Sequence, residues 1–202
     1  PSRIPLLVHP ISEGMADYAK GNRFYDPRDL ASMPKTRLIG NAVLSFLAKL
    51  STGYWHCFDP TNGFVAIHAE VARRLPLELM HRRYFFETDM LFRLNTLRAR
   101  VVDVPMPAIY GDEESNLRIL HSIPTFLAGH LRNTVKRIGY NYFLRDFNLA
   151  SFELVAGFAM LLFGTAYGLA HWGAGSGAAS AGVVMLSALP VILGLQFLLA
   201  FL

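Results

Sequence analysis

Two short polar motifs carry most of the chemistry that this sequence offers. The first, at residues 59–64, reads Asp-Pro-Thr-Asn-Gly-Phe; Asn62 and Gly63 favour a tight turn because both accept positive φ. The second, at residues 85–90, reads Phe-Phe-Glu-Thr-Asp-Met and places Glu87 and Asp89 at the start of a predicted helix, where free backbone amides favour ionised carboxylates. Taken singly, each motif has an ordinary structural explanation, a β-turn and a helix cap.

Charge adds a third feature. Arg23 follows a predicted turn at Gly21 and Asn22 and could clamp a phosphate, although a solvated arginine is the simpler alternative. Residues 1–149 hold all 19 Lys and Arg and all but one of the 15 acids, so they carry a net charge of +5. Such a segment suits phosphates, nucleotides or acidic lipid headgroups. Nucleic acid is disfavoured because no run of five basic residues occurs.

The single Cys57 excludes an intrachain disulfide, and the seven histidines show no metal-ligand spacing.

Alternating strands and helices must position these residues. Apolar periodicity and turn residues predict strands at 17–20, 63–67 and 101–104. They predict helices from about 34 to a cap at Gly53, from 68 to 75, and from Glu87 onward. Pro105 and Pro107 indicate that the last strand lies at a sheet edge. This order predicts an α/β domain with a largely parallel sheet, of which residues 1–120 would form the C-terminal half.

Beyond this domain the sequence has features that are typical of membrane-associated segments. We expect Pro124 to open a basic amphipathic helix within 121–149, which either lies in the membrane interface or forms a surface helix of the domain. Residues 150–202 contain two uncharged segments, about 154–172 and 181–202, each long enough to cross a bilayer. All basic residues precede them, so the positive-inside rule predicts a cytoplasmic domain. Gly164 and Gly168 form a small-residue face for helix packing, which leaves a homo-oligomer open. With no initiator Met and an apolar end at Leu202, we expect a fragment of a longer chain.

The order and spacing of four segments resemble the family 2 glycosyltransferases. The segments are residues 16–23, 59–64, 86–91 and 102–105. Within that family the sequence looks most like the polyprenyl-phosphate enzymes of the dolichol-phosphate mannose synthase kind, which carry C-terminal membrane helices. The resemblance implies a GT-A (Rossmann-like) domain in a multi-pass protein of the cell membrane. It also implies transfer of a sugar from a nucleotide-diphospho-sugar donor to a polyprenyl-phosphate acceptor on the cytoplasmic face, usually with inversion.

The resemblance also implies roles for individual residues. Glu87 and Asp89 would form the acidic catalytic motif; with a hydroxyl acceptor Asp89 would be the general base, and with a phosphate acceptor it would orient substrate. The implied substrate-binding residues are Arg23, Asn22, Asp59, Thr61, Asn62, Gly63 and Ser115. Residues 110–113 depart from the family pattern, since an arginine often stands there. A divalent cation, Mg²⁺ or Mn²⁺, would bridge the diphosphate, with ligands expected upstream of Pro1. The fragment alone would therefore be inactive.

Three alternatives remain beside this interpretation. One is a non-catalytic, membrane-tethered module that binds lipid or recruits partners. Another is a processive polysaccharide synthase, although no Gln-x-x-Arg-Trp sequence follows Asp89. A transporter is the weakest, because no charged residue occurs after Glu153.

Overall fold

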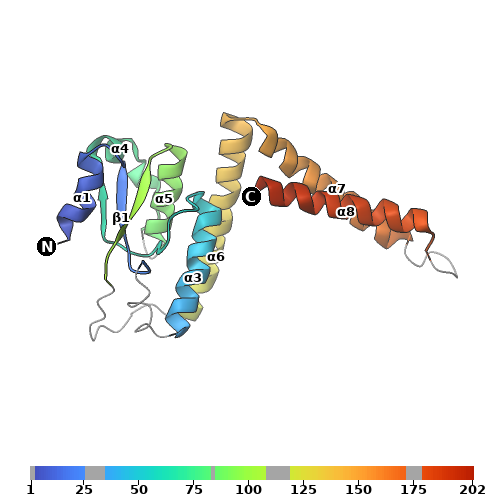
Figure 1. Cartoon of the computed structure of the whole chain (residues 1–202), viewed down its shortest axis with the longest axis horizontal. Coiled ribbons are helices and arrows are strands. Elements are labelled where there is room, and N and C mark those ends of the chain that lie inside the picture. The colour runs from blue at the N-terminus through green and yellow to red at the C-terminus, as the bar shows by residue number, and fades with distance from the viewer. Residues whose placement is uncertain (1–2, 26–34, 83–84, 108–118, 172–178) are drawn as a thin grey trace. The chain divides into compact units, whose positions relative to one another are not determined.

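The computed structural model describes residues 3–25, 35–82, 85–107, 119–171 and 179–202. They belong to two compact units, residues 1–138 and 139–202. The described part is mostly helical and contains one small sheet (Figure 1). The first unit holds, in chain order, α1 (Ile4–Ser12), β1 (Tyr18–Asn22), α3 (Lys35–Thr52), β2 (Val65–Ile67), α4 (Ala69–Arg74), a short 3₁₀ helix (Leu77–Leu79), α5 (Phe86–Thr96), β3 (Val101–Pro105) and α6 (Ile119–Ile138).

The sheet has three strands in the order β2-β1-β3. β1 runs parallel to β3 and antiparallel to β2, with Lys20 opposite Asp103 on one side and Val65 on the other. The sheet is therefore mixed, whereas the sequence predicts a largely parallel one. A strand's own residues do not specify its direction, which depends on how the preceding connection returns to the sheet. β3 lies at an edge of the described sheet, as its two prolines predict.

Helices cover both faces of this sheet. Side chains of successive strand residues point to opposite faces, so Ala19 packs with Leu7 of α1 while Tyr18 packs with Leu91 and Leu94 of α5. The larger of the two cores lies between the sheet, α4 and α5. Lys20 and Asn22 share the α5 side with Tyr18, and this placement directs polar side chains toward the end of β1.

Most predicted elements are confirmed, with three differences. Gly21 and Asn22, predicted to form a turn, are the last two residues of β1, where they pair with β3. α3 ends where predicted, since Gly53 adopts a φ of +82° and its amide donates to Lys49 O (2.9 Å). α1 was not predicted at all. α6 begins at Ile119 and contains Pro124, so the prediction that Pro124 opens the helix is wrong. A proline inside a helix removes one hydrogen bond and crowds the preceding turn, and α6 is held in place by packing against α3 and α5.

The second unit contains a π-helical stretch (Gly139–Arg145), α7 (Leu149–His171) and α8 (Ala181–Phe201). By length and composition both α7 and α8 can cross a membrane, which agrees with the two spans predicted from the sequence. Ser180 caps α8 by accepting a hydrogen bond from the Val183 amide (3.4 Å).

Small residues line the contact between α7 and α8. Gly157, Gly164 and Gly168 are buried on α7, and Ser187 and Gly194 are buried on α8. A Cβ atom at Gly164 would stand 2.6 Å from Ser187 O, so the two backbones approach more closely than alanine allows. The small-residue face predicted at Gly164 and Gly168 therefore packs within the hairpin.

Replacing Gly164 with alanine should destabilise the α7–α8 hairpin. The new methyl group meets a backbone carbonyl that cannot rotate away, and overpacking of this kind typically costs about 1–3 kcal/mol. Gly182→Ala is the matched control, because the nearest atom to its Cβ position is Ser180 Oγ at 3.9 Å. Thermal unfolding of both variants in detergent would measure the effect, and equal midpoints would contradict the packing described here.

Candidate functional site

The two polar motifs lie next to each other at the end of β1. The Gly21 amide donates to Phe64 O (2.9 Å), which joins the strand end to the 59–64 segment. A Cβ atom at Gly63 would stand 3.7 Å from Glu87 Oε1, so the turn and the start of α5 are neighbours. The structure thus places the predicted residues Asn22, Arg23, Asp59, Asn62, Gly63 and Glu87 around one end of the sheet, with the half-buried Thr61 in the same turn. Ser115 lies outside the described residues.

Arg23 and Asp59 form a bidentate ion pair. Arg23 Nε donates to Asp59 Oδ2 and Arg23 Nη2 to Asp59 Oδ1, both at 2.7 Å. Asp59 is fully buried and adopts a φ of +53°, and its own amide donates to Ser45 Oγ of α3 (3.2 Å). Arg23 remains about one third exposed (32%). Its guanidinium is therefore fixed in position by Asp59.

Two asparagines hold the ends of the neighbouring segments. Asn62 Oδ1 accepts a hydrogen bond from the Phe64 amide (3.0 Å), which closes the turn. Asn22 Nδ2 donates to Asp103 Oδ2 (2.9 Å) on β3. Gly21 sits so close to these groups that a Cβ atom there would stand 2.7 Å from Asn62 Nδ2. Asn62 therefore stabilises the turn, and Asn22 links the end of β1 to β3.

A buried lysine is the main feature of the site that the sequence analysis missed. Lys20 is only 2% exposed, and its Nζ lies 3.0 Å from Asp103 Oδ1, with Asp103 11% exposed. Lys20 Nζ also donates to the Phe58 carbonyl, and the Phe58 amide donates to Asp103 Oδ2 (2.7 Å). A lysine between apolar strand residues, with an aspartate on another predicted strand, was the available signal. The pair holds the segment before Asp59 against β1 and β3.

The two carboxylates of α5 have different environments. Glu87 is half-buried, and burial raises the pKa of its carboxyl group. Asp89 is fully buried and accepts three hydrogen bonds of 3.1 Å, from the His81 amide, Arg93 Nε and Asn133 Nδ2. Glu87 is thus the more accessible of the two, and a catalytic role for Asp89 stays a prediction.

Helix α6 contributes two further buried polar residues that the sequence analysis did not identify. Asn133 reaches Asp89, and His130 Nδ1 lies 2.8 Å from Ser51 Oγ of α3. Burial lowers the pKa of His130 to about 4, so its ring is neutral at physiological pH. The helical periodicity of α6 indicated only an apolar face, and neither contact has a local sequence signal. α6 belongs to the first unit through these contacts.

The described residues do not offer a site for the expected divalent cation. No group of three or more His, Cys, Asp or Glu side chains comes together within them. Each of the three aspartates near the sheet end already has a cationic partner: Asp59 has Arg23, Asp89 has Arg93 and Asp103 has Lys20. A carboxylate neutralised in this way is a poor ligand for Mg²⁺ or Mn²⁺. Upstream ligands for such an ion stay a prediction.

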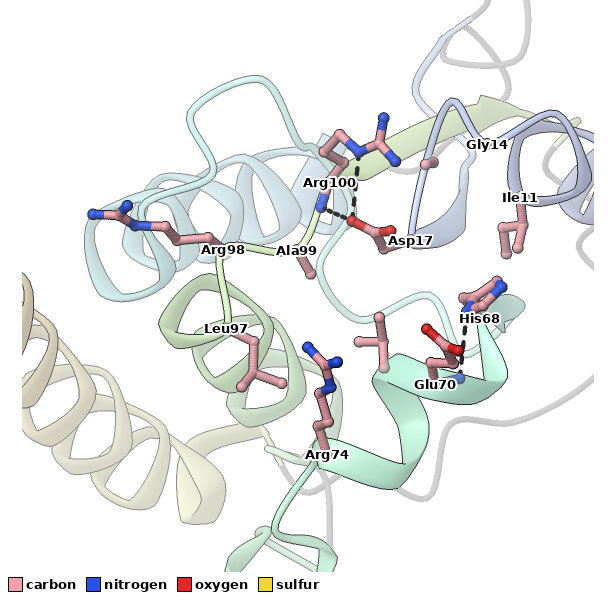
Figure 2. Close-up of a pocket in the computed structure, with 12 residues that line it drawn as sticks. Ile11, Gly14, Asp17, His68, Glu70, Arg74, Leu97, Arg98, Ala99 and Arg100 are labelled. Carbon is pink, nitrogen blue, oxygen red and sulfur yellow. Dashed lines mark hydrogen bonds and ion pairs between the residues drawn. The ribbon is translucent and has the colours of Figure 1, made fainter.

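A separate pocket of about 310 Å³ lies at the other end of the sheet, where β1 and β3 begin (Figure 2). Its lining includes Asp17, Glu70, Arg74 and Arg100, and contains none of the predicted site residues. Asp17 Oδ2 accepts a hydrogen bond from the Arg100 amide (2.7 Å). The charges of opposite sign partly neutralise each other, and the arrangement gives no reason to move the candidate site here.

Comparison with known proteins finds partial similarity to one sugar transferase and to one uncharacterized protein. Over 112 residues the chain is 28% identical to the UDP-N-acetylglucosamine–dolichyl-phosphate N-acetylglucosaminyltransferase of Methanococcus voltae, which covers 55% of this chain and 44% of that protein. It is also 28% identical over 112 residues to an uncharacterized protein of Methanocaldococcus jannaschii, covering 55% of this chain and 46% of the relative. The chain thus spans less than half the length of these curated relatives. No protein-family model and no solved structure matches it.

Lys20→Met should destabilise the first unit strongly. The change leaves Asp103 nearly buried without its cation, and removing one partner of a buried pair typically costs about 3–5 kcal/mol. Arg100→Met is the matched control, because Arg100 is 62% exposed and pairs with Asp17 at 3.6 Å; an exposed pair contributes about 0–1 kcal/mol. Urea unfolding of the two variants would compare these costs. Similar losses would show that the buried pair has no special role.

His130 should make the first unit less stable on acidification from pH 6.5 toward 4. The unfolded chain binds a proton at this residue below about pH 6.5, whereas the folded chain binds it only near pH 4. Acid therefore favours unfolding within this window, by about 1–2 kcal/mol between pH 7 and 5. Urea unfolding at both pH values would measure this loss, and His130→Gln should reduce it. An unchanged pH dependence in that variant would exclude His130 as its source.

Proposed function

We propose that this chain is part of a membrane-anchored glycosyltransferase that transfers a sugar from a nucleotide-diphospho-sugar to a polyprenyl phosphate. The observation that carries the proposal is the 112-residue similarity to a dolichyl-phosphate sugar transferase. Two helices of membrane-spanning length after the polar domain fit a lipid acceptor. Assignment to family 2, the GT-A fold, inversion at the anomeric carbon and a cytoplasmic location in the cell membrane are finer parts of the same proposal.

The geometry at the end of β1 supplies suitable groups for this reaction. The bond between the anomeric carbon and the donor diphosphate breaks, and a bond to an oxygen of the lipid phosphate forms. Arg23, held by Asp59 and partly exposed, would contact a phosphate group of donor or acceptor. Glu87, beside Gly63, would face the sugar and balance positive charge that develops at the anomeric carbon.

The acceptor phosphate needs no strong base. Its second pKa is about 6, so it is mostly a dianion at neutral pH and already nucleophilic. This fits the burial of Asp89, whose three hydrogen bonds leave it suited to hold the start of α5, the residues near His81 and α6 in register. We therefore propose that Asp89 keeps the elements of the site in place and that Glu87 contacts the substrate.

One observation favours the second candidate, a non-catalytic lipid- or partner-binding module. All three aspartates near the site are paired with cations, and such pairs can serve folding alone.

A catalytic assay of the full-length protein separates the two functions. Membranes containing it would receive labelled nucleotide sugars, polyprenyl phosphate and Mg²⁺ or Mn²⁺, and label would be followed into the lipid extract. Transfer that disappears with EDTA supports the enzyme and its metal; no transfer from any common donor favours the module.

Asp89→Asn in the full-length protein should abolish this transfer. The neutral amide loses the charge that pairs with Arg93, and only one of its two terminal atoms can accept a hydrogen bond where both carboxylate oxygens do so now. Glu13→Gln, at an exposed position, is the matched control and should retain wild-type transfer. A thermal unfolding curve for each variant would separate loss of activity from loss of folding. Near wild-type transfer by Asp89→Asn would exclude an essential role for this carboxylate.

A further inference from the structure

The pocket of about 310 Å³ at the opposite end of the sheet from the candidate site has walls from several elements. It lies among the C-terminal end of α1, the segment that leads into β1, helix α4 and the turn between α5 and β3. Small-molecule sites in proteins usually measure about 300–1,000 Å³. The pocket is at the lower end of this range, so it suits a small polar molecule rather than a whole nucleotide sugar.

Asp17 is held in place on one side of the pocket. Its carboxylate oxygen Oδ2 accepts a hydrogen bond from the Arg100 amide (2.7 Å) and lies 3.6 Å from Arg100 Nε. Its backbone amide donates to Arg100 O (2.8 Å), and its carbonyl accepts from the His68 amide (2.8 Å). These bonds join the start of β1 to the segments before α4 and β3. A carboxylate fixed in this way binds a ligand without first having to be ordered.

Glu70 and Arg74 supply two charges that are not used within the fold. They stand four residues apart on α4, and a carboxylate in this order before a cation favours an ion pair. Neither side chain has an ion pair or hydrogen bond in the described part of the chain. Figure 2 instead shows both of them extending from α4 toward Asp17 and Arg100. A guanidinium and a carboxylate therefore face the pocket separately.

The rest of the lining limits the class of ligand. Ile11, Val71 and Leu97 supply aliphatic surface, and no Phe, Tyr or Trp belongs to the lining among the described residues. A nucleobase would therefore lack a ring to stack on. A guanidinium is well suited to a phosphate group, and carboxylates accept hydrogen bonds from hydroxyl groups. The combination fits a molecule that carries one phosphate and several hydroxyls.

We propose that this pocket binds a small phosphorylated sugar, with Arg74 on the phosphate and with Glu70 and Asp17 on the hydroxyl groups. The site is distinct from the candidate site, because none of the predicted site residues line it. The inference goes beyond the proposed function and does not depend on it. A nucleotide-diphospho-sugar would bind at the other end of β1, whereas this pocket takes a smaller molecule.

Titration calorimetry of the full-length protein with glucose 6-phosphate tests the site. Arg74→Gln removes the guanidinium at an exposed position, so the fold should stay intact, which a thermal unfolding curve would check. Arg73→Gln is the matched control, since Arg73 is exposed on the same helix and does not line the pocket. We expect the affinity to fall about tenfold or more in Arg74→Gln alone, because only this variant loses a hydrogen bond between charged groups. Equal affinities in the two variants, or no binding by the wild type at millimolar concentration, would overturn the site.

Inorganic phosphate as a second probe tests the sugar part of the proposal. Glu70→Gln should weaken the binding of glucose 6-phosphate, because the amide has one acceptor atom where the carboxylate has two. It should not weaken the binding of inorganic phosphate, which has no sugar hydroxyls and is repelled by a carboxylate. Wild-type binding of inorganic phosphate as tight as that of glucose 6-phosphate would refute the sugar and leave a site for anions only. Failure of sugar transfer in the membrane assay would refute the proposed function and leave this site standing.

Discussion

The burial of carboxylates is the constraint around which the first unit is arranged. A buried aspartate is stable only beside a cation or several hydrogen-bond donors, and Asp59, Asp89 and Asp103 each have both. The three partners come from different elements, since Lys20 lies on β1, Arg23 just after it, and Arg93 on α5. The Arg23–Asp59 and Lys20–Asp103 pairs therefore hold the segment around Asp59 against the end of the sheet, whereas Arg93 pairs with Asp89 within α5. Removing any one partner would leave a charge that the interior cannot solvate.

Small and polar residues on the helices complete this arrangement. Ser45 accepts a hydrogen bond from the Asp59 amide, and Asn133 donates one to the Asp89 carboxylate. Gly129 lets α6 come close enough to make the second of these bonds. In the second unit, glycines bring the backbones of α7 and α8 together. Between membrane-spanning helices such close packing replaces the hydrophobic force that acts in water. Close approach is thus used for polar contacts in one unit and for van der Waals packing in the other.

Periodicity and turn chemistry predicted most of the elements because both act over a few residues. The cap at Gly53, the helix starting near Glu87 and the two long apolar segments each have a local cause, a positive φ, a free helix end or a run of apolar side chains. The antiparallel direction of β2 and the start of α6 before Pro124 were not predicted, because each is decided by packing against distant residues.

The sequence by itself determined the charge division between the two parts, the two membrane-length helices and the proximity in sequence of Glu87 to Asp89. Only the tertiary structure decided that these two carboxylates differ, one half-buried beside Gly63 and the other buried under Arg93 and Asn133. It alone paired Lys20 with Asp103, which lie 83 residues apart. The reason is physical: the free energy of a charge depends on the groups that surround it in space, and those groups come from strands and helices far apart along the chain.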